Sequence, residues 1–173
     1  EINLNSDKTI VTLKVTAENG NTQDYVINII KTDGANVSVN DIVASSAVPV
    51  SESSFILTAG YTVEVLKELF LKSCSSAEIS FSNKASGLLA TGDEITIKNG
   101  DDAKTYSIAI KGDTSADANI NIADLLKIQK HILGYINLSG SFLKAADVNS
   151  DGSVDIKDLL IVQKHILGYT TIK

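Results

Sequence analysis

The 173-residue sequence contains no arginine, tryptophan or methionine, and only one proline and one cysteine. All 15 basic residues are lysines, and 21 acidic residues give a net charge of −6. Because arginine is the preferred bidentate ligand of phosphate, its absence and the acidic balance exclude nucleic acid as an expected partner. A single cysteine, Cys74, cannot form an internal disulfide, and we expect it to be a small residue at or near a helix end.

The sequence also lacks an apolar run near the roughly 20 residues that a membrane-spanning helix needs. Aromatic residues make up only 5% of the chain, which leaves few side chains to stack on sugars. Hydrophobic residues nevertheless reach 43%, which is enough to form a core and argues against wholesale disorder.

Residues 1–34 have the pattern of a β-hairpin. Apolar and polar residues alternate on both sides of an Asn19-Gly20 turn, the apolar ones being Val11, Leu13 and Val15 before it and Tyr25, Ile27 and Ile29 after it. Two strands alone are marginally stable, so this hairpin either packs on the next segment or is the end of a truncated β-sandwich. Its run TAENGNTQDYVINI resembles the closing strands of bacterial cadherin-like β-sandwich domains.

Residues 35–111 are typical of a small α+β module. The pattern predicts strands at Val37, Val39 and Ile42, at residues 55–57 and at residues 79–81. It also predicts a closing hairpin, in which an Asn99-Gly100 turn separates Ile95 and Ile97 from Tyr106, Ile108 and Ile110. Thr62 is the expected cap of a helix over Val63–Lys72, with Val65, Leu66, Leu69 and Phe70 on one buried face.

The acidic residues of this module form no catalytic pattern. Glu64, Glu68, Asp93 and Glu94 occur singly or at positions expected to face solvent. Glycoside hydrolysis needs two carboxylates about 5 to 9.5 Å apart in a cleft that accepts a sugar, and nothing before residue 112 indicates such a cleft. We therefore expect the chain to be non-catalytic.

The last part of the chain is an internal duplication. The run DTSADANINIADLLKIQKHILGY from Asp113 aligns without a gap with DVNSDGSVDIKDLLIVQKHILGY from Asp147, at an offset of 147 − 113 = 34 residues. Self-similarity at such a spacing indicates a structural unit used twice.

The beginning of each copy fits a calcium-binding loop. Calcium binds about seven oxygens at ~2.4 Å, and a loop of twelve residues supplies them from positions 1, 3, 5, 7, 9 and 12, with a backbone carbonyl at position 7. These positions hold Asp113, Ser115, Asp117, Asn119, Asn121 and Asp124 in the first copy, and Asp147, Asn149, Asp151, Ser153, Asp155 and Asp158 in the second. Solvated turns or simple helix caps are the alternative, but every acidic residue of 112–173 falls on such a position, so we predict two Ca²⁺ ions.

The two loops differ at the sharp turn and in charge. Gly152 at position 6 of the second loop permits a positive φ, whereas Ala118 of the first carries a Cβ that costs roughly 1 kcal/mol there. The first loop also has three carboxylates against four in the second. We therefore predict that the first loop binds calcium more weakly.

An amphipathic helix is expected after each loop, over about Ile122–Leu133 and Ile156–Leu167, with Gly134 and Gly168 at the stops. The inward-facing residues are predicted to be Leu125, Ile128, Ile132 and Leu133 in the first helix, and Leu159, Val162, Ile166 and Leu167 in the second. Residues Gly140 to Ala146 are a candidate short linking helix. His131 and His165 are in equivalent places, but neither has a second nitrogen or sulfur ligand at metal spacing, so we do not expect zinc.

Loop plus exiting helix, twice, with a linker between, resembles the type I dockerin, in which Asp is also the usual residue at loop position 12. The resemblance covers residues 112–173. The predicted fold is therefore multi-module, with an N-terminal β-rich or α+β segment followed by an all-α dockerin of two calcium-loop plus helix repeats. Residues 35–111 resemble the small domains that precede dockerins in bacterial extracellular proteins as spacers.

The resemblance implies calcium-dependent anchoring. Type I dockerins bind cohesin modules of scaffold or cell-surface proteins, in extracellular bacterial assemblies (cellulosomes) that break down polysaccharides. It implies a secreted, monomeric chain that attaches a polysaccharide-degrading parent protein. The family's cohesin-contacting positions are Ile122, Ala123, Gln129 and Lys130 in the first copy, and Ile156, Lys157, Gln163 and Lys164 in the second.

Several alternatives stay open on the sequence. The Ser-Thr pair common at the first two contact positions is absent, which leaves the cohesin specificity undefined, and Ile122 and Ile156 also fit core packing. Two similar helices related by a two-fold allow two binding orientations, and Ala123 against Lys157 predicts that one dominates. A calcium-rigidified segment of a surface adhesin and a fragment of a glycoside hydrolase are the other functions considered.

Overall fold

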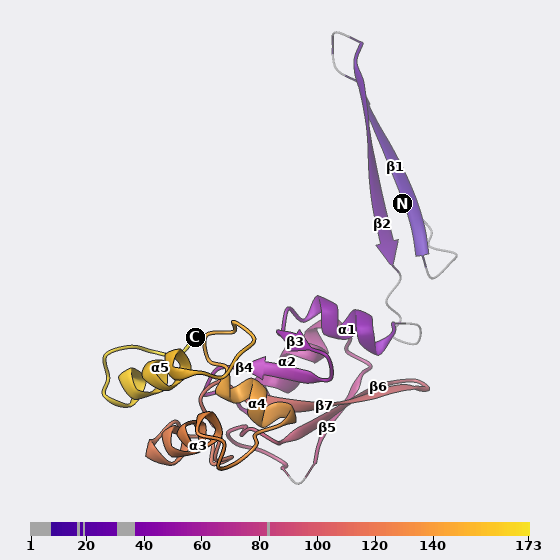
Figure 1. The fold of residues 1–173 in the computed structure, drawn as a ribbon. Helices are drawn as coiled ribbons and strands as arrows, with labels where there is room; N and C mark the ends of the chain where they lie inside the picture. The colour runs from indigo at the N-terminus through magenta and orange to yellow at the C-terminus, as the bar shows by residue number, and fades with distance from the viewer. Residues whose placement is uncertain (1–7, 17, 19, 31–36, 83) are drawn as a thin grey trace.

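The computed structural model describes residues 8–16, 18, 20–30, 37–82 and 84–173. Its N-terminal hairpin consists of β1 (Lys8–Thr16) and β2 (Thr22–Ile30), which pair antiparallel with Thr16 opposite Thr22. Gly20 in the connection has a φ of 84°, as a tight turn requires, whereas Asn19 lies outside the described residues. Figure 1 shows this two-stranded sheet apart from the rest of the protein.

A five-stranded sheet with the order β3-β4-β7-β6-β5 forms the centre of the molecule. Its strands are β3 (Val50–Ser51), β4 (Ser54–Leu57), β5 (Glu78–Phe81), β6 (Glu94–Asn99) and β7 (Asp102–Ile110). β4 runs parallel to β7 and the other neighbours are antiparallel. The predicted strands at 55–57 and 79–81 and the closing hairpin are confirmed, although the turn is Gly100-Asp101, since Asn99 pairs with Asp102.

The strand predicted at Val37, Val39 and Ile42 is wrong, because helix α1 (Val39–Ser45) begins there. Ser38 caps this helix by accepting a hydrogen bond from the backbone N–H of Asp41 at 3.2 Å. The helical spacing then places Val39, Ile42 and Val43 together in the core.

Helix α2 (Val63–Ser73) confirms the predicted helix and its cap, since Thr62 Oγ1 accepts from the N–H of Val65 at 3.3 Å. Val65 is 46% exposed and does not belong to the buried face of the helix. Val63 is buried in that face instead. Cys74 lies at the end of this helix, as expected. It is buried, and its Sγ lies 3.2 Å from Ser76 Oγ.

The core of this part lies between the sheet and the helices α1 and α2. Its aromatic centre is Phe55, whose ring centroid is 5.3 Å from that of Phe70 and 4.7 Å from that of Tyr106. Ile108 and Ile110 of β7 point into the same core. Asp93 is not the solvated surface residue expected, because Lys84 pairs with it at 2.7 Å.

The C-terminal part contains α3 (Ile122–Ile132), α4 (Gly140–Ala146) and α5 (Ile156–Ile166). Helices α3 and α5 pack around a second small core that includes Ile128 and Val162. The predicted inward orientation is wrong for Ile132 and Ile166, which are each 37% exposed, and for Leu133 and Leu167, which are each 60% exposed. Leu133 and Leu167 have a local reason. They are the C-cap residues, where the chain leaves the helix before the glycines at positive φ.

Helix α4 packs on β4 and β7, on the face of the sheet opposite α1 and α2. Ala109 alternates with the core residues of β7 and is buried on this side. Lys144 of α4 donates to the carbonyl of Ser51 at 2.8 Å and pairs with Glu52 at 3.0 Å. The linking helix therefore joins the C-terminal part to the central sheet. No helix in the described residues combines the length and apolar character needed to cross a bilayer.

Candidate metal centre and partner-binding face

The first loop brings three carboxylates together. Asp113, Asp117 and Asp124 each offer one oxygen, and these oxygens lie within 4.8 Å of one another. Asp113 lies three residues after the end of β7, Asp117 lies at the sharp turn, and Asp124 lies in the first turn of α3. The end of the strand, the loop and the start of the helix therefore direct one carboxylate each towards the same place.

Backbone N–H groups hold these carboxylates in place. The carboxylate of Asp113 accepts from Ala116 at 2.8 Å and from Ala118 at 3.2 Å, so the loop curls around it. Asp124 accepts from the loop and from the helix start, its donors being the N–H groups of Thr114 at 2.8 Å, Ser115 at 2.7 Å and Asn121 at 2.8 Å. Asn121 is the N-cap of α3, and Asp124 completes a capping box with it, which places the Asp124 carboxylate beside the other two.

The electrostatics of the first loop favour a cation. Asp113 and Asp124 are fully buried, and burial raises the pKa of Asp113 above its ordinary value. The N–H of Asn119 and the side-chain amide of Asn121 hold the pKa of Asp117 below its ordinary value. Within the described residues no lysine lies in ion-pair contact with these carboxylates. Buried carboxylates without a counter-charge are costly unless a metal or another cation joins them.

A buried hydroxyl at the same site is not satisfied by an ordinary hydrogen bond. Ser115 Oγ, at loop position 3, is shielded from solvent and forms no hydrogen bond of ordinary geometry, although it is near enough to Asp117 to contribute to the lowered pKa of that carboxylate. An unsatisfied buried polar atom costs about 1 to 3 kcal/mol, which an ion that takes oxygen ligands would relieve. Carboxylate, hydroxyl, amide and carbonyl oxygens are the ligands that calcium takes, so the residues of the first loop fit this ion.

The second loop has the same backbone. Loop position 4 is left-handed in both, with φ of 68° at Ala116 and 60° at Ser150, and so is position 6, with 65° at Ala118 and 87° at Gly152. Asp158 is fully buried like Asp124, and it accepts from the N–H groups of Asn149 at 3.2 Å and Asp155 at 3.0 Å. The expected positive φ at Ala118 is thus confirmed.

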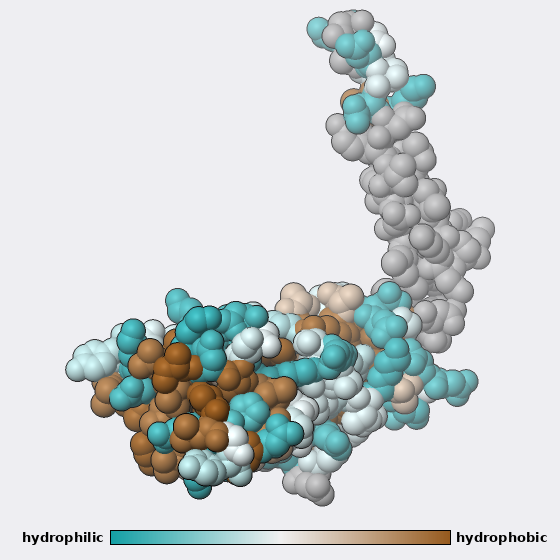
Figure 2. Space-filling view, in the orientation of Figure 1, coloured by the Kyte–Doolittle hydropathy of each residue, from teal (hydrophilic) through white to brown (hydrophobic). Residues whose placement is uncertain are grey.

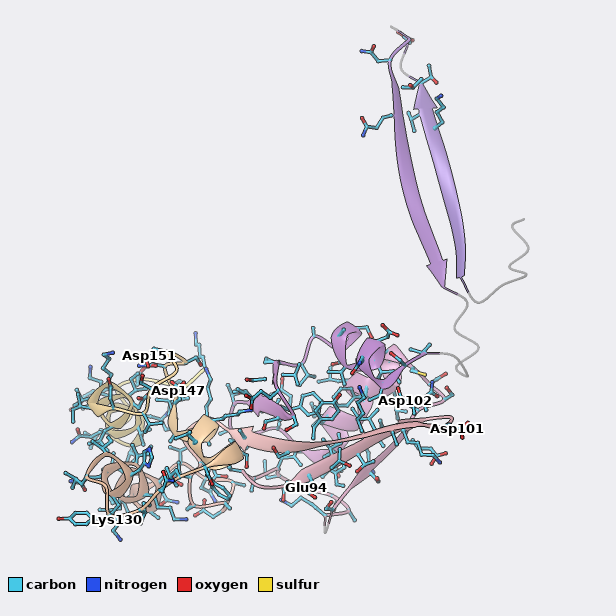
Figure 3. All side chains as sticks on the ribbon, turned by 45° about the vertical axis from the view of Figure 1, so that its right-hand side comes forward. Glu94, Asp101, Asp102, Lys130, Asp147 and Asp151 are labelled. Atoms are coloured by element: carbon cyan, nitrogen blue, oxygen red, sulfur yellow. The ribbon has the colours of Figure 1, made fainter. Side chains whose placement is uncertain are left out.

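A lysine distinguishes the second loop. Lys157 Nζ lies 3.0 Å from Asp151 Oδ2 and 3.5 Å from Asp155 Oδ2, and it lowers the pKa of Asp151 while its own pKa is raised. Asp151 and Asp147 lie close together in this loop (Figure 3), and the Asp151 N–H donates to Asp147 at 3.1 Å. Over the described residues 147–158, no three acidic groups converge as they do in the first loop. The predicted ranking of the two loops stays a prediction.

The predicted partner-binding residues all lie on the surface. Ile122 is 59% exposed and Ile156 57%, so core packing, the alternative for both, is wrong. The other six are also exposed, namely Ala123, Gln129, Lys130, Lys157, Gln163 and Lys164. In Figure 2 hydrophobic side chains gather where Figure 1 places the C-terminal helices.

Sequence reasoning missed part of this apolar surface. Leu126, Leu160, Tyr135 and Tyr169 are exposed, as are Leu133 and Leu167, and they form equivalent pairs in the two copies. The matching run DLLxxQKHILGY carries all of them, so the duplication itself was the available signal.

Both histidines have structural roles. His131 Nδ1 accepts from the N–H of Leu138 at 3.2 Å, and His165 Nδ1 accepts from the N–H of Ile172 at 3.4 Å. In each copy the imidazole therefore holds the chain that follows its helix.

Comparison with known proteins identifies the C-terminal part. The sequence model of the dockerin type I domain matches residues 111–167. A solved structure from Acetivibrio cellulolyticus contains a similar chain, at 30% identity. That structure is of the third cohesin ScaC in complex with the ScaB dockerin, with an IN to SI mutation in the N-terminal helix. The match covers 37% of this chain and 90% of that one, with a TM-score of 0.35. No curated protein matches the sequence.

Exchanging the turn residues of the two loops tests the cost of the Cβ at position 6. We expect Ala118→Gly to raise the free energy of unfolding of the calcium-saturated chain by about 1 kcal/mol, since it relieves a left-handed alanine. Gly152→Ala should lower it by a similar amount, because a Cβ there meets no atom within 4 Å and adds only backbone strain. Urea denaturation measures both, and a destabilising Ala118→Gly would contradict the expectation.

Removing the lysine tests its competition with the ion. We expect Lys157→Ala to raise the calcium affinity of the second loop by about two- to fivefold, since a solvent-exposed ion pair is weak and competes only modestly with the ion. Calorimetric titration at physiological salt measures the change. Lys164→Ala on the exposed surface of the same helix is the matched control, and an equal gain from both variants would assign the effect to net charge alone.

Proposed function

Residues 111–167 of this chain are a type I dockerin domain, and from that premise we propose that the chain is a non-catalytic anchor whose dockerin binds a cohesin in a calcium-dependent manner. The dockerin has two calcium-loop plus helix repeats and takes two Ca²⁺ ions. The cohesin belongs to a scaffold or cell-surface protein, and the parent of this chain is a secreted protein that degrades polysaccharide. The chain acts as a monomer.

The exposed apolar surface of α3 and α5 is the observation that carries this proposal. Ile122 and Ile156 are more than half exposed, and polar Gln129 and Gln163 lie on the same helices. An apolar patch with polar residues around it is typical of a protein-binding surface, because soluble proteins rarely expose such patches without use.

The loops support this surface from beneath. Asp124 and Asp158 each accept N–H groups from the loop and from the residue that caps the following helix. They therefore set the direction in which α3 and α5 leave the loops. A bound calcium ion supplies the positive charge that these buried carboxylates require. Without it we expect the helices to lose their orientation and the partner-binding face to lose its shape.

The two faces are not equivalent in charge. Lys157 lies where the first copy has Ala123, and its ammonium is engaged with Asp151 and Asp155 of its own loop. A cohesin that meets the second face also meets this cation, whereas one that meets the first does not. One of the two binding orientations therefore dominates.

Calcium-dependent capture by a cohesin tests the proposal. We expect the purified chain to bind at least one member of a panel of immobilised type I cohesins in the presence of calcium, and to lose both this binding and part of its helical circular dichroism in EDTA. A folded, calcium-loaded chain that binds none of them would instead favour a rigid adhesin segment. Release of reducing sugar from polysaccharide by the chain would make it an enzyme fragment.

Single substitutions on each face test the preferred orientation. We expect Ile122→Ser and Ile156→Ser together to weaken cohesin binding by about 30-fold or more, in the range of an interface hot spot, and the two single variants to differ from each other. Surface plasmon resonance in excess calcium measures the affinities. Val65→Ser, which changes an exposed apolar residue of α2, is the matched control. Equal losses from the two single variants would refute a preferred orientation.

A further inference from the structure

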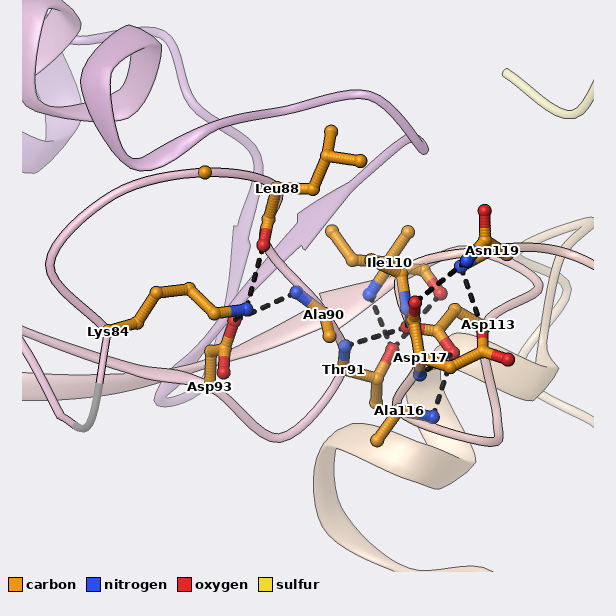
Figure 4. Close-up of polar contacts among 12 residues, drawn as sticks. Lys84, Leu88, Ala90, Thr91, Asp93, Ile110, Asp113, Ala116, Asp117 and Asn119 are labelled. Carbon is orange, nitrogen blue, oxygen red and sulfur yellow. Dashed lines mark hydrogen bonds and ion pairs between the residues drawn. The ribbon is translucent and has the colours of Figure 1, made fainter.

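Two equivalent carboxylates of the loops have different surroundings. Asp113, at position 1 of the first loop, is fully buried, whereas Asp147, at position 1 of the second, is partly exposed. The carboxylate of Asp147 accepts only from N–H groups of its own loop among the described residues. Asp113 also accepts from the N–H of Thr91, at 3.0 Å, and this donor comes from the central module (Figure 4).

Thr91 is itself fixed to the strand that leads into the first loop. Its Oγ1 accepts from the N–H of Ile110 at 2.9 Å and donates to the carbonyl of Ile110 at 3.3 Å. Ile110 is the last residue of β7, three positions before Asp113. The hydroxyl of Thr91 therefore sets the distance between its own N–H and the carboxylate that receives it.

The turn that contains Thr91 is held from its other side. Asp93 Oδ2 accepts from the N–H of Ala90 at 2.8 Å and from Lys84 Nζ at 2.7 Å, and Lys84 also donates to the carbonyl of Leu88 at 2.7 Å. Figure 4 shows this group of contacts around Asp93 next to the group around Thr91 and Asp113, and the two are linked by the peptide bond between Ala90 and Thr91. The donor of Asp113 is thus part of a preorganised turn.

Helix α4, in the C-terminal part, packs against the same turn and lies beside the start of the first loop. The ring of Phe142 lies 3.2 Å from the place that a Cβ on Gly92 would take, so it packs directly on the turn. The N–H of Gly112 donates to the carbonyl of Ala145 at 2.8 Å, immediately before the first loop. The first loop therefore receives a hydrogen bond from the central module. The second loop begins at the end of α4 and only lines open pockets with Glu52 and Pro49 of the central module.

We propose that residues 37–111 are a structural part of the first calcium site and that Thr91 is the positioning residue that holds Asp113 as a ligand, on the basis of the calcium binding proposed above. The central module then lowers the cost of organising the first loop and offsets the strain at Ala118. Because coupling between two sites is reciprocal, calcium in the first loop also stabilises the central module.

Removing the hydroxyl of Thr91 in the full chain tests this role. We expect Thr91→Val to weaken calcium binding in the first loop by about tenfold, as outer partners of metal ligands commonly do, and to leave the second loop unchanged. Calorimetric titration measures each loop separately in Asp151→Ala and Asp117→Ala backgrounds, which disable the second and the first loop respectively. Thr96→Val removes another threonine hydroxyl of the same sheet, bonded to Thr105 at 2.8 Å, and should change neither loop.

Hydrogen exchange of the unmodified chain gives a test that does not depend on the folding of a variant. We expect the amide of Thr91 to exchange at least tenfold more slowly with calcium than with EDTA, because its acceptor is then held in place. Equal weakening of both loops by Thr91→Val, or unchanged exchange at Thr91 in a chain that binds two ions, would overturn this role alone. Absence of any calcium binding would instead overturn the proposed function.

Discussion

A buried carboxylate at the start of a helix is the constraint on which the C-terminal part of this protein depends. Asp124 and Asp158 are fully buried, and each joins the beginning of a loop to the cap of the helix that follows. This geometry fixes the helix direction, but it places negative charge where water cannot reach it. Such a buried charge is favoured by a positive partner. In the second loop Lys157 pairs with Asp151 and Asp155 and not with the buried Asp158.

Because of this constraint, α3 and α5 keep an exposed apolar surface as well as the small core between them. Because α3 and α5 leave equivalent loops in the same way, they present matching apolar residues, and only the row around Ile128 and Val162 is buried between them. Leu126 and Leu160 are left on the outside. A domain of this size buries one face of each helix, so the other face is available to a partner.

The places where sequence reasoning failed have specific causes. Val37 and Val39 fit an extended alternation, but Val39 and Ile42, three residues apart, share a face only in a helix, and Ser38 caps that helix. Leu133 and Leu167 continue an apolar pattern past the point where the helix has ended, so they face solvent. Asp93 looked like a solvated acid because its partner Lys84 belongs to a different local segment.

The sequence by itself determined the strands around Phe55 and Ile95, the helix capped by Thr62 and the helices that follow the two loops, because these features depend on spacing over a few neighbours. Only the tertiary structure decided that Thr91 donates to Asp113 and that Lys144 reaches Ser51. Such contacts join residues far apart in the chain, and no local periodicity encodes them. Whether Ile122 and Ile156 are buried was likewise undecided until the helices were packed, since burial depends on what lies opposite a side chain and not on the side chain alone.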